Sequence, residues 1–172
     1  MESDQGQVSH RQKCPSLGPR PNQLIHPMDH QDQQEDRPLR IRLRSDCPCG
    51  SQQAYNDCCR PYHIGKAQPK TAEQLMRARY SAFFFRLPDF LVSTTHPDTR
   101  EKNLRAELES FLPTAMWRSL NILSSSKGGP KDNKGKVEFV AQCHEDGQLR
   151  ELYEHSRFRR HKGQWKYLDA KG

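Results

Sequence analysis

Apolar positions between residues 71 and 168 follow two different periods, one after the other. From 71 to 111 they recur every three or four positions, which is typical of amphipathic helices. From Met116 onward they alternate with polar positions, which is typical of strands with one buried face. Residues 1–40 show neither pattern and are rich in Gln, Asp, Pro, Arg and His, so we predict that they are disordered.

Three helices are predicted in the first of these regions. The first begins at the capping-box sequence Thr71-Ala72-Glu73-Gln74 and runs through Arg86. Its apolar stripe consists of Ala72, Leu75, Met76, Tyr80, Phe83, Phe84 and Leu87. A second, short helix begins at Pro88 and ends near His96-Pro97, and a third runs from Arg100 to Phe111.

Four strands are predicted in the second region, at residues 116–123, 137–143, 149–160 and 165–168. Residues 124–136 contain Gly, Ser, Lys and Asp and predict an exposed, mobile loop. Three helices followed by a strand meander predict an α+β fold, with the helices packed on one face of an antiparallel sheet.

The composition limits the protein to one ordinary domain plus an extension. The chain has 172 residues, of which 33% are hydrophobic, so part of it contributes no core. It contains neither an apolar run of about eighteen residues nor an apolar N-terminal signal, so we expect no transmembrane segment and a cytoplasmic location. The net charge of +7 favours anionic partners, although most such charge is solvated surface.

Four of the six cysteines form the pattern C-x-C-x8-C-C, namely Cys47, Cys49, Cys58 and Cys59. Two close pairs of thiols suit a soft tetrahedral metal ion, zinc before iron. The alternative is disulfide bonding, but a bridge within either pair would be strained and a reducing cytosol disfavours crossed bridges. Four thiolates leave no open coordination position, so we expect a structural Zn²⁺ and no catalysis at the metal.

A ligand pocket is a second hypothesis. Its candidate residues are Arg79, Tyr80, His96, Trp117 and Glu154. Arg79, or Arg77 if the helix is rotated, is expected on a buried helix face, and Glu154 on a buried strand face, so the two charges should meet. Arg79 and Glu154 then either form the polar floor of a ligand site or act as a structural ion pair. His96 either belongs to the same site or only ends a helix. Because no known catalytic arrangement occurs in the sequence, enzymatic activity is not favoured and no catalytic residue is assigned.

Basic residues recur along the last strands and suggest a third kind of site. They are Arg150, Arg157, Arg159, Arg160, Lys162 and Lys166. Arg157 and Arg159 are expected on the outer strand face with Tyr153, and such a surface can stack bases and contact phosphates. The same strands also contain acidic residues, which reduce the positive charge of the patch, namely Glu151, Glu154 and Asp169. Nucleic acid therefore stays open as a partner.

Two sets of motifs resemble known families. Cys47-Pro48-Cys49-Gly50-Ser51 with Cys58-Cys59 resembles the SEC-C zinc motif, known from the C-terminal tail of the SecA translocase. Residues 62–63, 71–83, 95–100, 137–141 and 151–158 resemble the bacterial YchJ family. The resemblance covers roughly residues 45–170 and implies a nuclear-transport-factor-2-like (cystatin-like) α+β domain behind the zinc motif. Gln52-Gln53 replaces the Gly-Lys pair that usually follows in the motif. We therefore do not infer from the resemblance that this chain binds the same partner as SecA.

These observations divide the chain into a disordered extension (1–40), a SEC-C zinc-binding motif (41–66) and a nuclear-transport-factor-2-like domain (67–172). We expect the SEC-C motif to act as a structural recognition module for a protein or a small-ligand partner. One alternative is a nucleic-acid- or ribosome-associated factor that uses the basic strand face. Another is a cavity enzyme of isomerase or hydrolase type, with His96, Tyr80 and Glu154 as candidates.

Overall fold

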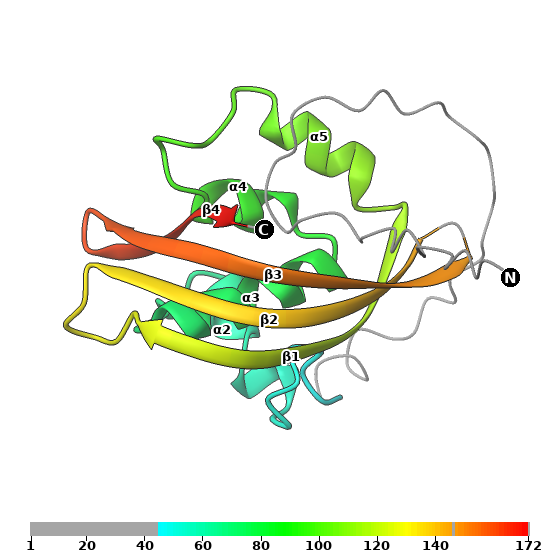
Figure 1. Cartoon of the computed structure of the whole chain (residues 1–172), viewed down its shortest axis with the longest axis horizontal. Coiled ribbons are helices and arrows are strands. Elements are labelled where there is room, and N and C mark those ends of the chain that lie inside the picture. Colours follow the sequence, from blue (N-terminus) through cyan, green and yellow to red (C-terminus); the bar gives the residue numbers. More distant parts are fainter. Residues whose placement is uncertain (1–44, 146, 172) are drawn as a thin grey trace, which may run out of the picture.

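A computed structural model describes residues 45–145 and 147–171 (Figure 1), so the predicted disorder of residues 1–40 lies outside the described residues. Within the described part, a short 3-10 turn and four helices precede four strands. They are η1 (Tyr55–Asp57), α2 (Arg60–His63), α3 (Ala72–Phe84), α4 (Pro88–Thr94), α5 (Leu104–Phe111), β1 (Ala115–Lys127), β2 (Lys134–Glu145), β3 (Gln148–His161) and β4 (Gln164–Lys171).

The strands form one antiparallel sheet in the order β1-β2-β3-β4, a simple meander. The helices lie on one face of this sheet (Figure 1), as the change of period predicts. Along β2 and β3 buried residues alternate with more exposed ones, and the buried set faces α3. The core between them contains Leu75, Met76, Phe139, Phe158 and Tyr167.

Helix α3 begins where the sequence predicts. The Gln74 backbone N–H donates to the Thr71 hydroxyl at 3.1 Å, and the Gln74 side-chain oxygen accepts from the Lys70 N–H at 2.8 Å. The helix ends at Phe84, two residues before the predicted end at Arg86. Its buried face includes Arg79 and Tyr80.

The prediction of an exposed, mobile loop over 124–136 is wrong about the structure at both ends, although residues 124–127 are exposed as predicted. Strand β1 continues to Lys127 and β2 already begins at Lys134, because the two strands keep pairing there. Gly128 and Gly135 are buried against the start of α3, where a Cβ added to Gly135 would lie 2.9 Å from that of Ala72. The Ala72 N–H also donates to the Gly128 carbonyl at 2.8 Å. These contacts fix the β1–β2 hairpin on the helix.

The chain after α4 covers the free edge of β4. Thr95 forms a parallel bridge with Tyr167, and the His96 N–H donates to the Tyr167 carbonyl at 2.7 Å. The Thr99 hydroxyl donates to the Leu168 carbonyl at 2.6 Å. This pairing satisfies backbone groups that an edge strand would otherwise expose.

Candidate metal centre

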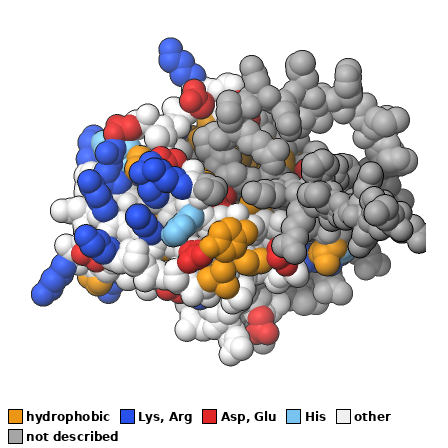
Figure 2. Space-filling model, in the orientation of Figure 1, with side chains coloured by type: hydrophobic (Ala, Val, Ile, Leu, Met, Phe, Trp, Pro, Cys, Tyr) orange, Lys and Arg blue, Asp and Glu red, His pale blue; other side chains and the backbone are white. Residues whose placement is uncertain are grey.

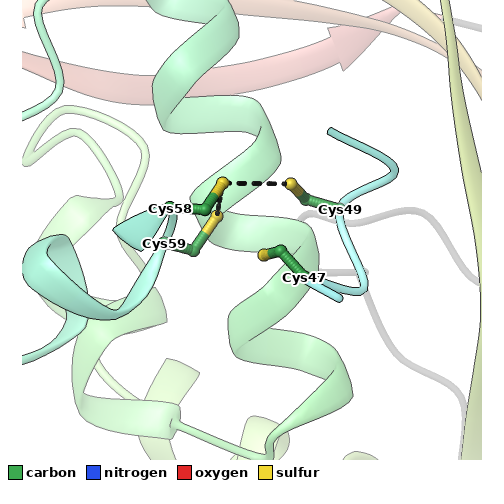
Figure 3. Close-up of side chains that lie close together, drawn as sticks. All are labelled: Cys47, Cys49, Cys58 and Cys59. Atoms are coloured by element: carbon green, nitrogen blue, oxygen red, sulfur yellow. Dashed lines mark hydrogen bonds between the residues drawn. The ribbon is translucent and has the colours of Figure 1, made fainter. Parts of the chain in front are cut away.

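The four cysteine thiols of the predicted zinc motif point toward one another beside α3 (Figure 3). All four Sγ atoms lie within 4.8 Å of one another, with 3.6 Å between Cys49 and Cys58 and 3.8 Å between Cys58 and Cys59. A tetrahedral ion with zinc–sulfur bonds of about 2.3 Å holds its sulfurs about 3.8 Å apart, whereas a disulfide needs about 2.05 Å. The spacing and the soft donor set therefore fit Zn²⁺ and do not fit the disulfide alternative.

Two short turns bring the cysteine pairs together. In the first, Asp46 bridges to Ala54 and the Cys47 N–H donates to the Gln53 carbonyl at 2.7 Å. In the second, η1 leads directly into Cys58 and Cys59, and Cys59 is the residue before α2. Because each turn supplies two adjacent thiols, one ion would crosslink both turns.

Gly50 lets the first turn lie directly against the sheet. Its φ is +74°, in the left-handed region, and a Cβ built there would lie 2.8 Å from the Leu120 carbonyl oxygen of β1. Backbone atoms cannot move aside as a flexible side chain can, so only glycine satisfies both the φ angle and the contact.

We therefore expect Gly50→Ala to destabilise the protein by about 2–4 kcal/mol, from left-handed strain plus the forced displacement of the turn. Gly65→Ala is the matched control, because Gly65 has a φ of +72° and nothing within 4 Å of its added Cβ. The control should cost only about 1 kcal/mol. Urea unfolding of the two variants measures the difference, and equal losses would contradict the proposed contact with Leu120.

Polar side chains from α3 support the cysteines from outside the cluster. The buried Ser81 hydroxyl lies 3.5 Å from the Cys47 sulfur, and the Arg77 guanidinium donates to the Cys49 carbonyl at 2.7 Å. Within the motif itself, the Ser51 hydroxyl lies 3.1 Å from the Cys58 sulfur. Such hydrogen bonds orient metal ligands. They also join the motif to the helix that forms the core of the following domain.

His63 makes a second connection between the motif and α3. Its Nε2–H donates to the Ala78 carbonyl at 2.8 Å, which leaves Nδ1 to accept from the Tyr55 hydroxyl at 2.7 Å. Burial lowers the pKa of His63, consistent with the neutral ring that this pair of hydrogen bonds requires. The sequence offers little signal for this role beyond the position of His63 shortly after the second cysteine pair.

Hydrogen bonds among the four thiols set their protonation in the metal-free cluster. The hydrogen bond with Cys49 raises the pKa of Cys47 to about 12. Hydrogen bonds with the other three cysteines raise the pKa of Cys59, and the one with Cys47 has the largest effect. The hydrogen bond with Cys59 lowers the pKa of Cys58 to about 7, and that with Cys47 lowers the pKa of Cys49. At neutral pH the cluster is therefore a mixture of thiols and thiolates.

Zinc binding at pH 7 should consequently release protons, because metal ligands bind as thiolates. The raised pKa values of Cys47 and Cys59, with the pKa of about 7 at Cys58, predict about two to three protons released per ion, so the apparent affinity should weaken as the pH falls. Calorimetric titration in two buffers with different ionisation enthalpies counts the protons. Heats that do not depend on the buffer would contradict this picture of the cluster.

Arg79 and Glu154, which the sequence predicts to meet, are both buried between α3 and the sheet. The Arg79 guanidinium donates to the Leu91 carbonyl at 2.9 Å and lies 4.5 Å above the Tyr167 ring. Glu154 accepts from the Ser156 hydroxyl at 2.6 Å. Burial lowers the pKa of Arg79 to about 10, while the charges of Tyr167 and Glu154 act in the opposite direction. The two residues therefore interact electrostatically in the core.

The other three pocket candidates are also buried. Tyr80 and Trp117 are buried together, with ring centroids 5.7 Å apart and the rings nearly perpendicular. His96 lies at the covered edge of the sheet, with its Nε2 3.2 Å from the Arg159 guanidinium. Burial lowers the pKa of His96, and the positive charge of Arg159 lowers it further. The Arg79 guanidinium also donates to the hydroxyl of Thr95, the residue before His96, at 3.3 Å.

The fold and the cysteine cluster together define a class: SEC-C motif proteins with a nuclear-transport-factor-2-like domain. Residues 71–170 match the family model described as YchJ, middle NTF2-like domain. The chain belongs to this family, also called UPF0225. A UPF0225 protein of Sodalis glossinidius is 39% identical over 131 residues, which cover 75% of this chain and 84% of the relative. One from Bordetella pertussis is 42% identical over 126 residues, which cover 72% and 90%.

Two solved structures share the architecture. The solution structure of a SEC-C motif containing protein from Rhodopseudomonas palustris has a TM-score of 0.68 and 30% identity, covering 74% of this chain and 98% of that one. The crystal structure of a SEC-C motif containing protein from Psychrobacter arcticus has a TM-score of 0.63 and 28% identity, covering 75% and 83%. The predicted family and fold class are therefore confirmed. Among the described helices, none has the length and apolar character needed to cross a membrane.

Proposed function

We propose that this chain is a cytoplasmic zinc-binding protein whose SEC-C motif is a structural recognition module, presented on the nuclear-transport-factor-2-like domain. The observation that carries the proposal is the set of four mutually close thiols, attached to α3 through Ser81 and Arg77. When bound, zinc would crosslink the two cysteine turns and add its binding free energy to folding. A shell filled by four thiolates supports a structural ion.

The surface that the motif presents is polar and preorganised. The exposed side chains around the two turns are Asp46, Gln52, Gln53, Asn56 and Asp57. The turns are short and are held against α3 and β1. Binding a partner would therefore cost them little conformational entropy. We therefore propose that this surface binds a protein partner by hydrogen bonds and acidic contacts.

The test compares the intact chain with Gln53→Arg/Asp57→Arg, which alters the exposed surface and leaves all four ligands in place. Gln148→Arg/Glu151→Arg changes charge to the same extent on exposed residues of β3 and serves as the control. Affinity capture from cell extract should recover partners with the intact chain and the control, and lose them with the motif variant at equal zinc content. The same partners on all three proteins would contradict the proposal.

A second candidate function rests on the charge distribution. Lys and Arg side chains gather over one end of the strands (Figure 2). Five exposed lysines belong to this end, namely Lys127, Lys131, Lys134, Lys136 and Lys162. Among the described residues none of the five has a carboxylate partner within 4.0 Å, whereas Arg157 and Arg159 pair with Asp169 and Asp98. Uncompensated cations of this kind support contact with nucleic-acid phosphates.

Salt dependence tests this second candidate with single-stranded RNA as the ligand. Removing three phosphate contacts with Lys134→Gln/Lys136→Gln/Lys162→Gln should reduce the slope of log K against log salt by about 2. Lys66→Gln/Lys102→Gln/Lys171→Gln removes equal charge from exposed residues outside this end. Identical slopes for the two triple variants would exclude a specific role for the strand ends.

A further inference from the structure

A cleft of ≈ 580 Å³ lies between α2, α4 and β4, on residues other than the five predicted pocket candidates. Its lining includes the aromatic side chains of Tyr62, Phe90 and Trp165 and the cations Arg100 and Lys166. The volume is in the range of sites that bury most of a small organic ligand. The cleft also borders the zinc motif, because Tyr62 and His63 of α2 form part of its wall.

Among the residues that the structure describes, the two cations in this cleft are hydrogen-bonded only to backbone carbonyls. Lys166 Nζ donates to the Ser93 carbonyl at 2.7 Å, and the Arg100 guanidinium makes a long hydrogen bond of 3.4 Å to the Val92 carbonyl. No carboxylate of the described residues lies within 4.0 Å of either cation. Cationic side chains that line a cleft without a carboxylate beside them are suited to binding an anionic group.

The surrounding charges reinforce this preference. Burial lowers the pKa of Lys166, and the charges of Arg100 and of the buried Arg79 lower it further, so the three cations repel one another. The one carboxylate in the lining, Asp89, is held in an ion pair with Arg105. An anion at Lys166 and Arg100 would relieve the repulsion, and a partly enclosed cleft strengthens such attraction.

The aromatic side chains indicate what the rest of the ligand is like. Phe90 and Trp165 line the same cleft as the cations, and Trp165 is held by a 3.0 Å hydrogen bond from its indole N–H to the Lys70 carbonyl. Fixed rings beside a cationic site favour a planar, apolar body joined to a charged group.

We propose that this cleft binds a small organic anion, with its carboxylate, sulfonate or phosphate group at Lys166 and Arg100. Its planar body would lie against Phe90 and Tyr62, beside the buried Trp165, whose ring is covered by the Arg160 guanidinium. This site goes beyond the recognition role of the zinc motif and does not depend on it. Its ligand class follows from the charge and the aromatic lining together.

Anilinonaphthalene sulfonate, an aromatic sulfonate, is a suitable probe of the full-length zinc-loaded protein. We expect saturable binding to one site, observed as probe fluorescence and as a shift of the Trp165 indole N–H signal in NMR spectra. Arg100→Gln/Lys166→Gln should weaken binding at least tenfold, and Lys102→Gln/Lys127→Gln, with the same charge loss, should change it less than twofold. Equal affinity for the two double variants, or an unshifted Trp165 signal, would overturn the proposal.

Two further comparisons keep the test decisive. If the double variant fails to fold, Arg100→Gln alone, on an exposed side chain with one long hydrogen bond, should still weaken binding at least threefold. Benzoate and phenyl phosphate should displace the probe, and the stronger competitor identifies the preferred anionic group. Benzyl alcohol should compete at least tenfold less well, and competition equal to that of benzoate would remove the argument for a charged ligand.

Discussion

Removal of zinc should unfold the SEC-C motif and lower the free energy of unfolding of the protein by about 3–5 kcal/mol. A ligand that binds only the folded state stabilises it by about 4 kcal/mol at a thousand times its Kd. The motif depends on this contribution because its own buried residues are few: Cys47, Cys49, Tyr55 and Cys59. Without the ion, the buried thiols lose the interaction that joins the two turns.

Thermal unfolding of the intact chain, with and without a chelator, measures this effect. The variant Cys58→Ser/Cys59→Ser should begin at the lower stability and show no further loss with chelator, which separates loss of metal from side effects of the reagent. The prediction fails if the intact chain unfolds at the same temperature in both conditions.

The second large effect is expected at Arg79. Arg79→Met should destabilise the protein by about 3–5 kcal/mol, because it removes the buried positive charge that interacts with buried Glu154. It also removes the donor that Leu91 and Thr94 share, at 2.9 and 2.8 Å. Burying polar groups without a partner adds to the cost.

A double-variant cycle isolates the contribution of the buried charges. Arg79→Met/Glu154→Leu should cost clearly less than the sum of the two single changes, because neither charge is then left alone in the core. Urea unfolding of the four proteins gives the coupling free energy. Strictly additive losses would show that Arg79 and Glu154 contribute independently of each other.

Local sequence signals predicted much of this fold. The cap at Thr71 and the alternation along β2 and β3 depend on neighbouring residues in the chain, and both are present in the structure. In β1 two register irregularities interrupt the alternation that the sequence predicts. The cysteine spacing likewise brought together four ligands from one short segment. The strand ends around Gly128 and Gly135 were missed, because their burial depends on contact with Ala72 of a distant helix.

The surroundings of the site were harder to predict for the same reason. Ser81, Arg77 and His63 connect the motif to α3 through contacts between residues far apart in the sequence. The cleft at Lys166 and Arg100 is also assembled from α2, α3, α4, β4 and the segments that connect them, and no single stretch of sequence contains its pattern. The sequence also does not show that Arg79 and His96 both contact Tyr167, because that contact is made between α3, the chain after α4 and β4.

The metal content of the purified chain tests the central claim most directly. Native mass spectrometry of protein prepared without added metal should give the mass of the chain plus one zinc ion, and a chelator should remove that ion. The variant Cys58→Ser/Cys59→Ser should give the metal-free mass under the same conditions. A metal-free intact chain, or one whose four cysteines are joined by disulfides, would contradict the account.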